Sequence, residues 1–495
     1  MPRDRELLSF EKSRPGRSGL NLAIPGEWVD EARSELGGLA RGEPPLLPEL
    51  SELETVRHFS ALARLNHGVD DDFYPLGSCT MKYNPKLNEE LAAHQAFLGV
   101  HPAMPEVAVQ GWLAVYHHTE RMLAEITGMD AVTFHPMAGA HGELTGMMLV
   151  RAWHESRGRP RRKVLVPDSA HGTNPASAAL CGFEVVNVPS GEDGLLHPDT
   201  LRQYLDEDVA ALMLTNPNTL GLFEAHVEEV AALLHAAGAL LYYDGANLNA
   251  IVGRIRPGDM GFDVVHLNLH KTFSTPHGGG GPGAGPVGVK EDLEPFLPVP
   301  RVVREGEGGP YRLSSDFPRS IGRIGSWYGN ALVVLKAYLY MLNLGGRGLR
   351  EVSAKAVLNA RYLERLLAEQ GWKTAYGQHP CMHEFVLSGR DLPNRVRTVD
   401  VAKRIIDAGY HPPTVYFPLI VREALMVEPT ETEPPEKLEE FAAAMARILR
   451  EAQDEPEVLK SAPHSTPVGR LDEARAARLL ELTWSPRSLT ETQKI

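Results

Sequence analysis

Four apolar runs in the middle third of the chain each end in polar residues. The runs are 163–166, 210–214, 239–243 and 264–269. Ligands of doubly wound sheets bind at the carboxyl ends of the strands. A lysine at such an end is costly to desolvate unless it has a use. The spacing therefore predicts a ligand site at one sheet edge, formed by the residues that follow these runs: His171, Thr215, Asn216, Asp244, Asn247, His270 and Lys271.

One cofactor chemistry explains this set of residues. Lysine forms a Schiff base with an aldehyde, and a carboxylate facing a pyridinium nitrogen keeps the ring an electron sink. This pairing is typical of pyridoxal phosphate (PLP) sites. Asp244 and Lys271 lie 27 residues apart, which leaves room for one crossover between adjacent parallel strands. The flat ring of His171 suits stacking on the cofactor.

A phosphate site is expected upstream, at Gly139 and Ala140. These small residues precede a helix that we expect to begin near Glu143. Small residues let the backbone approach a ligand, and a helix N-terminus supplies N–H donors for phosphate.

Each of these features also has a plainer interpretation. A lone Asp-Gly after a strand is usually a turn, and a lone strand-end His or Lys is a weak signal. His266, His270 and His277 suggest a metal site, but the first two lie far apart on an extended strand and His277 follows a proline. The glycine-rich loop at 277–286 lacks the Gly-Lys-Ser/Thr ending of a P-loop. The ordered combination therefore favours PLP, with no metal and no nucleotide.

The elements that position these residues alternate between strands and helices. Further strands are expected at 184–188 and 287–290, and helices at 105–127, 143–156 and 228–237. This alternation of strands and helices predicts an α/β fold with a mostly parallel, doubly wound sheet covered on both faces.

The rest of the chain predicts the domain organisation. Long helices over 326–369 lead to a smaller α+β domain with strand candidates at 384–387 and 426–428, and helices are also expected at 51–66 and 472–480. The predicted parts are an extended or helical segment over 1–70, a large PLP-binding domain over 71–325, a small domain with linking helices over 326–465, and a tail over 466–495 that frays.

Composition excludes several classes of protein. The 495 residues include 50 Lys+Arg and 64 Asp+Glu, a net charge of −14 that disfavours nucleic-acid binding. Cys79, Cys181 and Cys381 are too few for a disulfide framework and fit no zinc pattern, which indicates a reducing compartment. No apolar run reaches the roughly 18 residues of a membrane helix, and no secretory signal is evident. We expect a cytoplasmic protein.

The segment from His266 to Pro286 resembles the lysine-bearing motif of glycine dehydrogenase (decarboxylating), the P-protein of the glycine cleavage system. The resemblance covers most of residues 50–465. Single-chain members are about twice as long, and this chain is similar to their C-terminal half, as in the second (beta) subunit of a split P-protein. Five more segments resemble the family in the same order: 74–85, 138–146, 169–177, 215–221 and 244–249.

The resemblance implies a fold-type I PLP architecture and a role for each matching residue. Lys271 would hold the cofactor, Asp244 the pyridine nitrogen and His171 the ring face. Gly139 and Ala140 would contribute to phosphate binding, and Thr215 or Asn216 would reach the ring oxygen. His270 and Asn247 would orient substrate or cofactor. Ser78 and Cys79 lie in a shared motif without an assigned role, and Arg319 and Arg323 are candidates for sensing the substrate carboxylate.

The implied reaction is that of glycine dehydrogenase (aminomethyl-transferring). Glycine loses CO2, and its aminomethyl group passes to the lipoyl arm of the H-protein. The implied partners are P-protein subunit 1 (alpha), in a heterotetramer, the lipoylated H-protein and, indirectly, the T- and L-proteins. The alternatives are another fold-type I enzyme (an amino-acid decarboxylase or an aminotransferase), a non-catalytic structural subunit and, third, a metal-dependent hydrolase.

Overall fold

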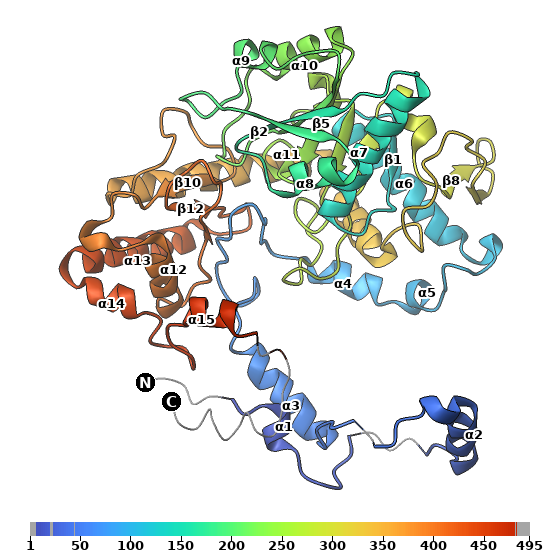
Figure 1. The fold of residues 1–495 in the computed structure, drawn as a ribbon, viewed down its shortest axis with the longest axis vertical. Coiled ribbons are helices and arrows are strands. Elements are labelled where there is room, and N and C mark those ends of the chain that lie inside the picture. Colours follow the sequence, from blue (N-terminus) through green and yellow to red (C-terminus); the bar gives the residue numbers. More distant parts are fainter. Residues whose placement is uncertain (1–5, 20–22, 44, 481, 483–495) are drawn as a thin grey trace. The chain divides into compact units, whose positions relative to one another are not determined.

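The computed structural model describes residues 6–19, 23–43, 45–480 and 482. Residues 69–459 form one compact unit, and residues 1–68 with 460–495 form another (Figure 1). Every predicted site residue lies in the unit of residues 69–459. The division at residues 70, 325 and 465 stays a prediction, and residues 481 and 483–495 of the predicted fraying tail lie outside the described residues.

A seven-stranded sheet forms the centre of the larger unit. Its order is β1-β7-β6-β5-β4-β2-β3, and only β7 runs against the others. The predicted mostly parallel α/β sheet is therefore confirmed. The strands are β1 (Ala131–Thr133), β2 (Lys163–Pro167), β3 (Glu184–Val188), β4 (Val209–Thr215), β5 (Leu240–Gly245), β6 (Val264–Leu267) and β7 (Val287–Val289). The sequence did not predict β1.

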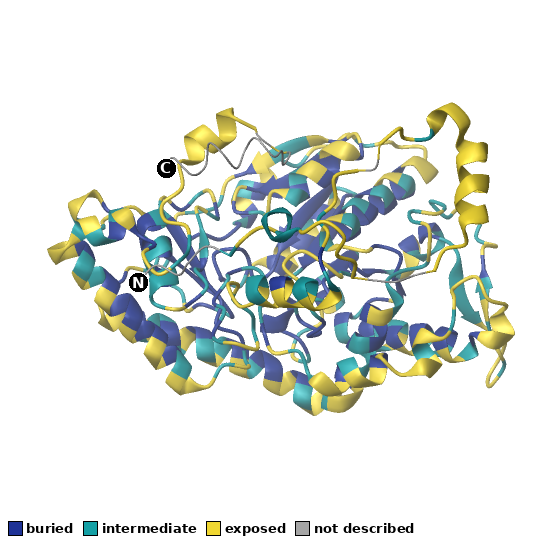
Figure 2. Ribbon diagram, turned by 90° about the horizontal axis from the view of Figure 1, so that it is seen from below, coloured by how far each residue is buried: buried dark blue, intermediate teal, exposed yellow. Residues whose placement is uncertain are grey.

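Helices cover both faces of this sheet, because alternate side chains of a strand point to opposite faces. On β5, Leu241 and Tyr243 pack in the core that α6, α10 and α11 cover, whereas Leu240 and Tyr242 pack in the core beneath α7 and α8. Figure 2 shows the result as dark blue strands within outer helices whose far sides are yellow. The helices are α6 (Gln110–Thr127), α7 (Gly139–Ser156), α8 (Thr173–Leu180), α9 (Pro198–Arg202), α10 (Val227–Ala236) and α11 (Ala331–Glu369).

A smaller antiparallel sheet follows, with the order β10-β12-β11. It packs with α12, α13 and the second half of α11 around a separate core that includes Leu363, Phe385 and Phe441. The expected long helices over 326–369 are one helix, α11, interrupted at Gly345 where φ is +58°. The elements are β10 (Phe385–Ser388), α12 (Thr398–Asp407), β11 (Thr414–Val415), β12 (Ala424–Val427), α13 (Pro435–Asp454) and α14 (Pro456–Ser461).

The remaining elements are short helices, 3-10 turns and one hairpin. In the smaller unit, α3 begins after Ser51, whose side chain accepts from the backbone of Glu54 in a capping box. None of the described helices is long and apolar enough to cross a membrane. The other elements are α1 (Ser9–Lys12), α2 (Gly26–Leu36), α3 (Glu52–Ala63), α4 (Lys86–Ala92), α5 (Gln95–Leu98), α15 (Glu473–Arg478), the hairpin β8 (Arg301–Arg304) and β9 (Tyr311–Ser314), and 3-10 turns at Gly37–Leu39, Glu106–Ala108, Leu248–Ala250, Pro257–Met260, Glu291–Phe296 and Pro393–Arg395.

Candidate active site

A cavity of about 550 Å³ lies at the carboxyl ends of the parallel strands. It brings together residues that follow β2, β4, β5 and β6, the start of α7, and the loop at residues 77–79. The predicted residues that line it are Gly139, Ala140, His171, Thr215, Asp244, Asn247, His270 and Lys271.

Asp244 is the buried carboxylate of this cavity. It lies on β5 opposite His266 of β6, and its Oδ1 accepts from the backbone N–H of Ala246 at 3.1 Å and lies 3.5 Å from Nε2 of His266. Oδ2 accepts from the side-chain amide of Asn174 at 3.2 Å. Burial alone would raise the pKa of Asp244, but His266, the Ala246 hydrogen bond and the charges of His171 and Lys271 together lower it. The carboxylate therefore stays ionised, as a protonated pyridine nitrogen requires.

Lys271 reaches the same cavity from the turn after β6. Its Nζ donates a hydrogen bond to the backbone oxygen of Ser78 at 2.7 Å. The amine and the carboxylate thus face one space, which is the arrangement that a PLP site needs.

The start of α7 forms a close-fitting backbone surface beside the cavity. A Cβ atom at Gly139 would lie 2.6 Å from Oδ1 of Asn268, so a larger residue would require the Asn268 side chain to move. The first N–H groups of a helix have no partner within it, and they suit a phosphate.

His171 lies at the mouth of the cavity. Its Nδ1 lies 2.6 Å from the hydroxyl of Thr173, and its ring meets Phe417 edge-on at 5.6 Å. Burial lowers the pKa of His171 below its ordinary value, which favours the neutral ring.

His270 and Asn247 are also close to Lys271. Burial, aided by the charge of Lys271, lowers the pKa of His270 to about 3, so its ring is neutral. The amide of Asn247 donates to Oε1 of Glu384 at 3.2 Å, and its Oδ1 has no partner within the chain.

Asn216 does not line the cavity, in contrast to Thr215. Its amide donates to the backbone oxygen of Glu224 at 3.4 Å, and its Oδ1 accepts from the Glu224 backbone N–H at 3.0 Å. Both polar atoms of the Asn216 side chain thus close the loop after β4. The hydroxyl of Thr215 is buried in the cavity without a partner.

Arg319 and Arg323 do not line the cavity either. Both are exposed, and the guanidinium of Arg319 lies over the ring of Phe296. Their role as carboxylate sensors stays a prediction.

Buried polar atoms without partners test whether PLP fits. Such atoms are rare in folded proteins, and each one needs a reason. A cofactor that carries a phosphate, a hydroxyl and a ring nitrogen would supply the missing partners, and the volume lies within the range of cofactor sites. The residues present therefore fit PLP. The unpartnered atoms at the cavity are Thr215 Oγ1, Asn247 Oδ1, Asn268 Oδ1, His270 Nδ1, His277 Nδ1 and Glu143 Oε2.

Glu143 is a cavity residue that the sequence did not reveal. Burial, together with the nearby charge of Asp244, raises its pKa to about 8. Its Oε1 accepts from the hydroxyl of Thr173 at 2.9 Å. The sequence marked Glu143 only as the expected helix start, because nothing local shows that it faces Asp244.

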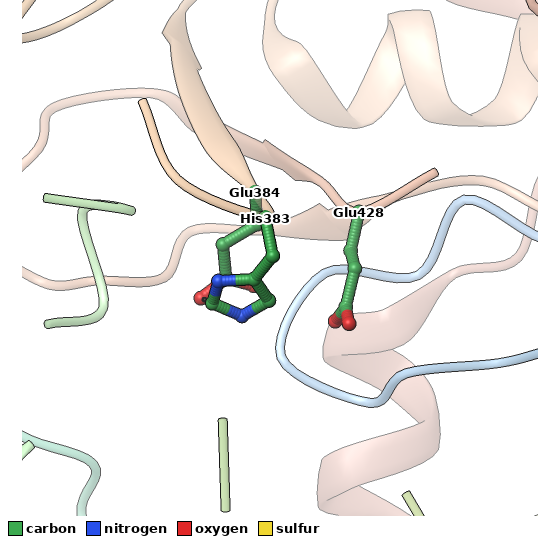
Figure 3. A group of neighbouring side chains, drawn as sticks. All are labelled: His383, Glu384 and Glu428. Carbon is green, nitrogen blue, oxygen red and sulfur yellow. Dashed lines mark ion pairs between the residues drawn. The ribbon is translucent and has the colours of Figure 1, made fainter. Parts of the chain in front are cut away.

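A second group of titratable side chains lies behind the loop at 77–80. His383, Glu384 and Glu428 offer ligand atoms within 4.8 Å of one another, an arrangement that a metal ion could share (Figure 3). However, all four carboxylate oxygens already accept hydrogen bonds from protein donors. Burial lowers the pKa of His383 to about 3, so its ring is neutral. We therefore interpret the two glutamates as hydrogen-bond acceptors for the loop. Their donors are the Ser78 backbone, the Asn247 amide, the Thr80 backbone and hydroxyl, and the Asn249 amide.

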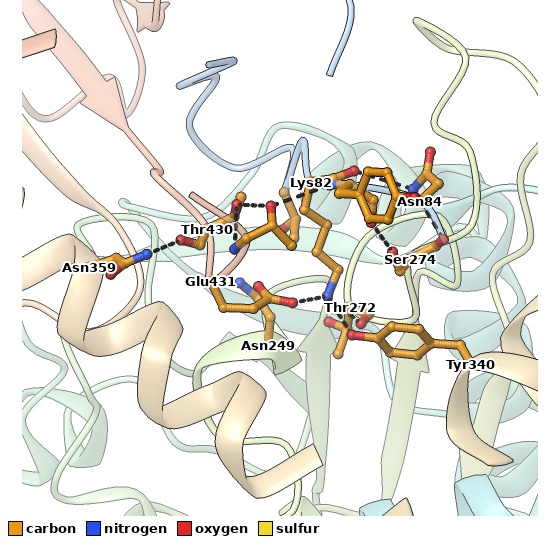
Figure 4. A network of polar contacts seen from close by, with 12 residues as sticks. Lys82, Asn84, Asn249, Thr272, Ser274, Tyr340, Asn359, Thr430 and Glu431 are labelled. Carbon is orange, nitrogen blue, oxygen red and sulfur yellow. Dashed lines mark hydrogen bonds and ion pairs between the residues drawn. The ribbon is translucent and has the colours of Figure 1, made fainter. Parts of the chain in front are cut away.

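Lys82, which follows the same loop, forms a buried ion pair and also contacts the turn that carries Lys271 (Figure 4). Nζ of Lys82 donates to Glu431 Oε1 at 2.7 Å, to the Thr272 backbone oxygen at 2.8 Å and to the Tyr340 hydroxyl at 3.2 Å. The amide of Asn84 donates to the backbone oxygen of Ser274 at 3.1 Å. The loop and the lysine turn are therefore held as one structure.

Comparison with known proteins agrees with this geometry. Residues 352–464 match the family model "Glycine dehydrogenase, C-terminal domain", and residues 142–298 match "Aminotransferase class-V". A "Probable glycine dehydrogenase (decarboxylating) subunit 2" from Halalkalibacterium halodurans is 57% identical over 97% of this chain and 98% of its own length. A protein of the same name from Caldanaerobacter subterraneus subsp. tengcongensis is 54% identical over 98% of this chain and 100% of its own length.

Solved structures show the same architecture. A crystal structure of glycine decarboxylase (P-protein) of the glycine cleavage system, in inhibitor-bound form, superposes with a TM-score of 0.72 at 25% identity, covering 87% of this chain and 100% of that one. A glutamate decarboxylase from Lactobacillus brevis superposes with a TM-score of 0.65 at 12% identity, over 84% and 96% of the two chains, and shows the fold alone. The fold is that of the fold-type I PLP enzymes. With more than half of its residues identical to such relatives over nearly its whole length, the chain belongs to the family of glycine dehydrogenase (decarboxylating) subunit 2.

Proposed function

We propose that this chain is the PLP-bearing subunit of a glycine decarboxylase, which releases CO2 from glycine. The observation that carries the proposal is the meeting of Asp244 and Lys271 in one cavity beside the start of α7. The names of its relatives support the same activity.

PLP, when bound, supplies an electron sink for the loss of CO2. Lys271 would hold the cofactor, and Asp244 would hold the proton on its ring nitrogen. The first N–H groups of α7, at Gly139 and Ala140, would bind its phosphate. His171 would pack on the ring, and Thr215 would reach the ring oxygen.

His270 and Asn247 lie beside Lys271 and would orient the substrate. Both present neutral polar groups with unpartnered atoms to the cavity. A site closed to water favours the loss of a charged carboxylate.

The proposal extends to the partners of the reaction. The name "subunit 2" implies a subunit 1, and we propose that the two subunits form a heterotetramer. The aminomethyl group would pass to the lipoyl arm of the H-protein. The T- and L-proteins would then act on the loaded H-protein. A cytoplasmic location stays a prediction.

Replacing Lys271 by Ala tests the assignment of the cofactor. The variant, expressed with subunit 1, should lose the visible absorbance of the lysine-bound cofactor and all exchange of labelled bicarbonate into glycine. Lys355→Ala, at an exposed lysine of α11, is the matched control and should keep both. Exchange retained by Lys271→Ala would refute the assignment, and amino transfer to a keto acid by the unaltered enzyme would favour an aminotransferase.

A further inference from the structure

The loop that faces Lys271 contains an unusual turn. Ser78 and Thr80 have φ values of +64° and +47°, a left-handed conformation that residues other than glycine rarely adopt. Cys79 lies between them and lines the cavity. Such a backbone persists only where its surroundings impose it.

Two buried glutamates hold this conformation by accepting hydrogen bonds from the backbone of the turn. Oε2 of Glu384 accepts from the Ser78 backbone N–H at 2.7 Å, and Oε2 of Glu428 accepts from the Thr80 backbone N–H at 3.0 Å. Oε1 of Glu428 also accepts from the Thr80 hydroxyl at 2.6 Å. Both glutamate side chains have no solvent exposure.

The small sheet aligns the two glutamates. Glu384 comes directly before β10 and Glu428 directly after β12, and these antiparallel strands pair with Phe385 opposite Val427. The two carboxyl groups therefore leave the same end of the sheet side by side, as Figure 3 shows.

The opposite side of the turn receives the lysine. The backbone oxygen of Ser78 accepts from Nζ of Lys271 at 2.7 Å, while the hydroxyl of Thr414 donates to the backbone oxygen of Gly77 at 2.8 Å. The N–H groups of the turn thus point to carboxyl groups, and its Ser78 carbonyl points to an ammonium group.

We propose that this turn is the resting site of Lys271 whenever the lysine is not bonded to the cofactor, with Glu384 and Glu428 as positioning residues. The inference rests on the proposed function, in which Lys271 carries PLP. The lysine must leave the cofactor when glycine arrives and must return when the product leaves.

The release step produces a charge that needs a partner. The bond from the cofactor carbon to Nζ breaks as the bond to the glycine nitrogen forms. The glycine ammonium loses two protons, and Nζ of Lys271 gains two and departs as an ammonium. A buried ammonium without an acceptor is costly. The Ser78 carbonyl supplies the acceptor, and the carboxyl groups behind it supply negative charge.

The charge of Lys271 acts on both glutamates. Burial raises the pKa of Glu384 and of Glu428 above the ordinary value, and their proximity raises that of Glu384 further. With Lys271 at the Ser78 carbonyl, its charge offsets part of this rise on both groups.

The test is the replacement of Glu428 by Gln in the complex with subunit 1. The amide keeps the shape and removes the charge. Without the resting site, the free-lysine state is less stable, so two equilibria should move in opposite directions. Glycine, which must release the lysine, should bind about fivefold to tenfold more weakly in a titration of cofactor absorbance. PLP should bind to the apoenzyme more tightly by a similar factor, because the apoenzyme also holds a free lysine.

Controls separate this role from damage to the fold. Glu384→Gln should reproduce both shifts. Glu120→Gln, at a half-buried glutamate that also accepts a backbone N–H, from Val132 at 3.2 Å, should change neither. Damage to the site would weaken both ligands, so weaker binding of both, or no change in either, would overturn the inference. Failure of the proposed function would be distinct, since the unaltered enzyme would then show no lysine-bound cofactor absorbance.

Discussion

At the scale of single residues, Asp244 is the last of three buried side chains in a row, after Tyr242 and His266. The Tyr242 hydroxyl lies 2.7 Å from Nδ1 of His266, and Nε2 of His266 lies 3.5 Å from Asp244. A hydroxyl that donates to Nδ1 leaves the ring proton on Nε2, which then faces the carboxylate. All three side chains lie on neighbouring strands, so the sheet fixes their spacing.

This row predicts graded effects of substitution. Asp244→Asn should keep some cofactor and lose most of the exchange rate, by about a hundredfold or more, because the electron sink weakens. Tyr242→Phe should lose less, about threefold to tenfold, because it removes one hydrogen bond that orients His266. Bicarbonate exchange and cofactor absorbance measure both effects. If Tyr242→Phe lost as much exchange rate as Asp244→Asn, the predicted ranking of the two effects would be contradicted.

At the scale of elements, the loop 74–85 joins the lysine turn to the small sheet. A Cβ atom at Gly77 would overlap Cγ of Met426 and lie 2.6 Å from its backbone oxygen, so only glycine permits this approach. Lys82 fixes the other end of the loop (Figure 4). Burial would lower the pKa of Lys82, but Glu431 and Tyr340 outweigh it and raise the pKa above its ordinary value, so the lysine stays charged.

Lys82 and Glu431 predict a double-mutant result. Lys82→Met should reduce the free energy of unfolding by about 3–5 kcal/mol, because it leaves Glu431 buried without its cation. Adding Glu431→Leu should restore most of this stability, since a well-packed apolar pair often replaces a buried ion pair. Urea unfolding of both variants measures the change. Equal stability of the single and the double variant would show that the ion pair is not the cause.

At the scale of the whole molecule, buried carboxyl groups determine how stability depends on pH. Burial raises the pKa of Glu120, Glu224 and Glu433 to about 7 each, and that of Glu143 to about 8. The folded chain therefore retains protons that the unfolded chain has released. The stability that these groups contribute is complete below pH 4.5 and is lost as the pH rises through 7 to 8.

Buried histidines act in the opposite direction below pH 6.5. Burial lowers the pKa of His270 and His383 to about 3 and that of His154 to about 4, so the stability that these rings contribute grows as the pH rises to 6.5. The cofactor-free protein should therefore become less stable from pH 7 to pH 8, where only the carboxyl groups still titrate. Each carboxyl group contributes a slope of at most about 1.4 kcal/mol per pH unit, and Glu143→Gln should remove one such contribution. Urea unfolding at pH 7 and pH 8 measures the trend, and stability that rises over this range would contradict it.

The order of residues alone was enough to predict the sheet, the cofactor and the carboxyl edge at which it binds. Strand ends are local features, and parallel strands bring their carboxyl ends together whatever the rest of the chain does. For this reason the order of residues along the chain was enough to group His171, Asp244 and Lys271. The lysine motif and its resemblance identified the family.

Which side chains face the cavity, and which contacts hold them there, depends on how distant segments pack together. Thr215 and Asn216 are neighbours in sequence, yet the loop after β4 turns one into the cavity and uses the other to close itself. Glu384 and Glu428 meet Ser78 and Thr80 across 306 and 348 residues. No local period encodes such contacts, because they join residues that are far apart in the sequence.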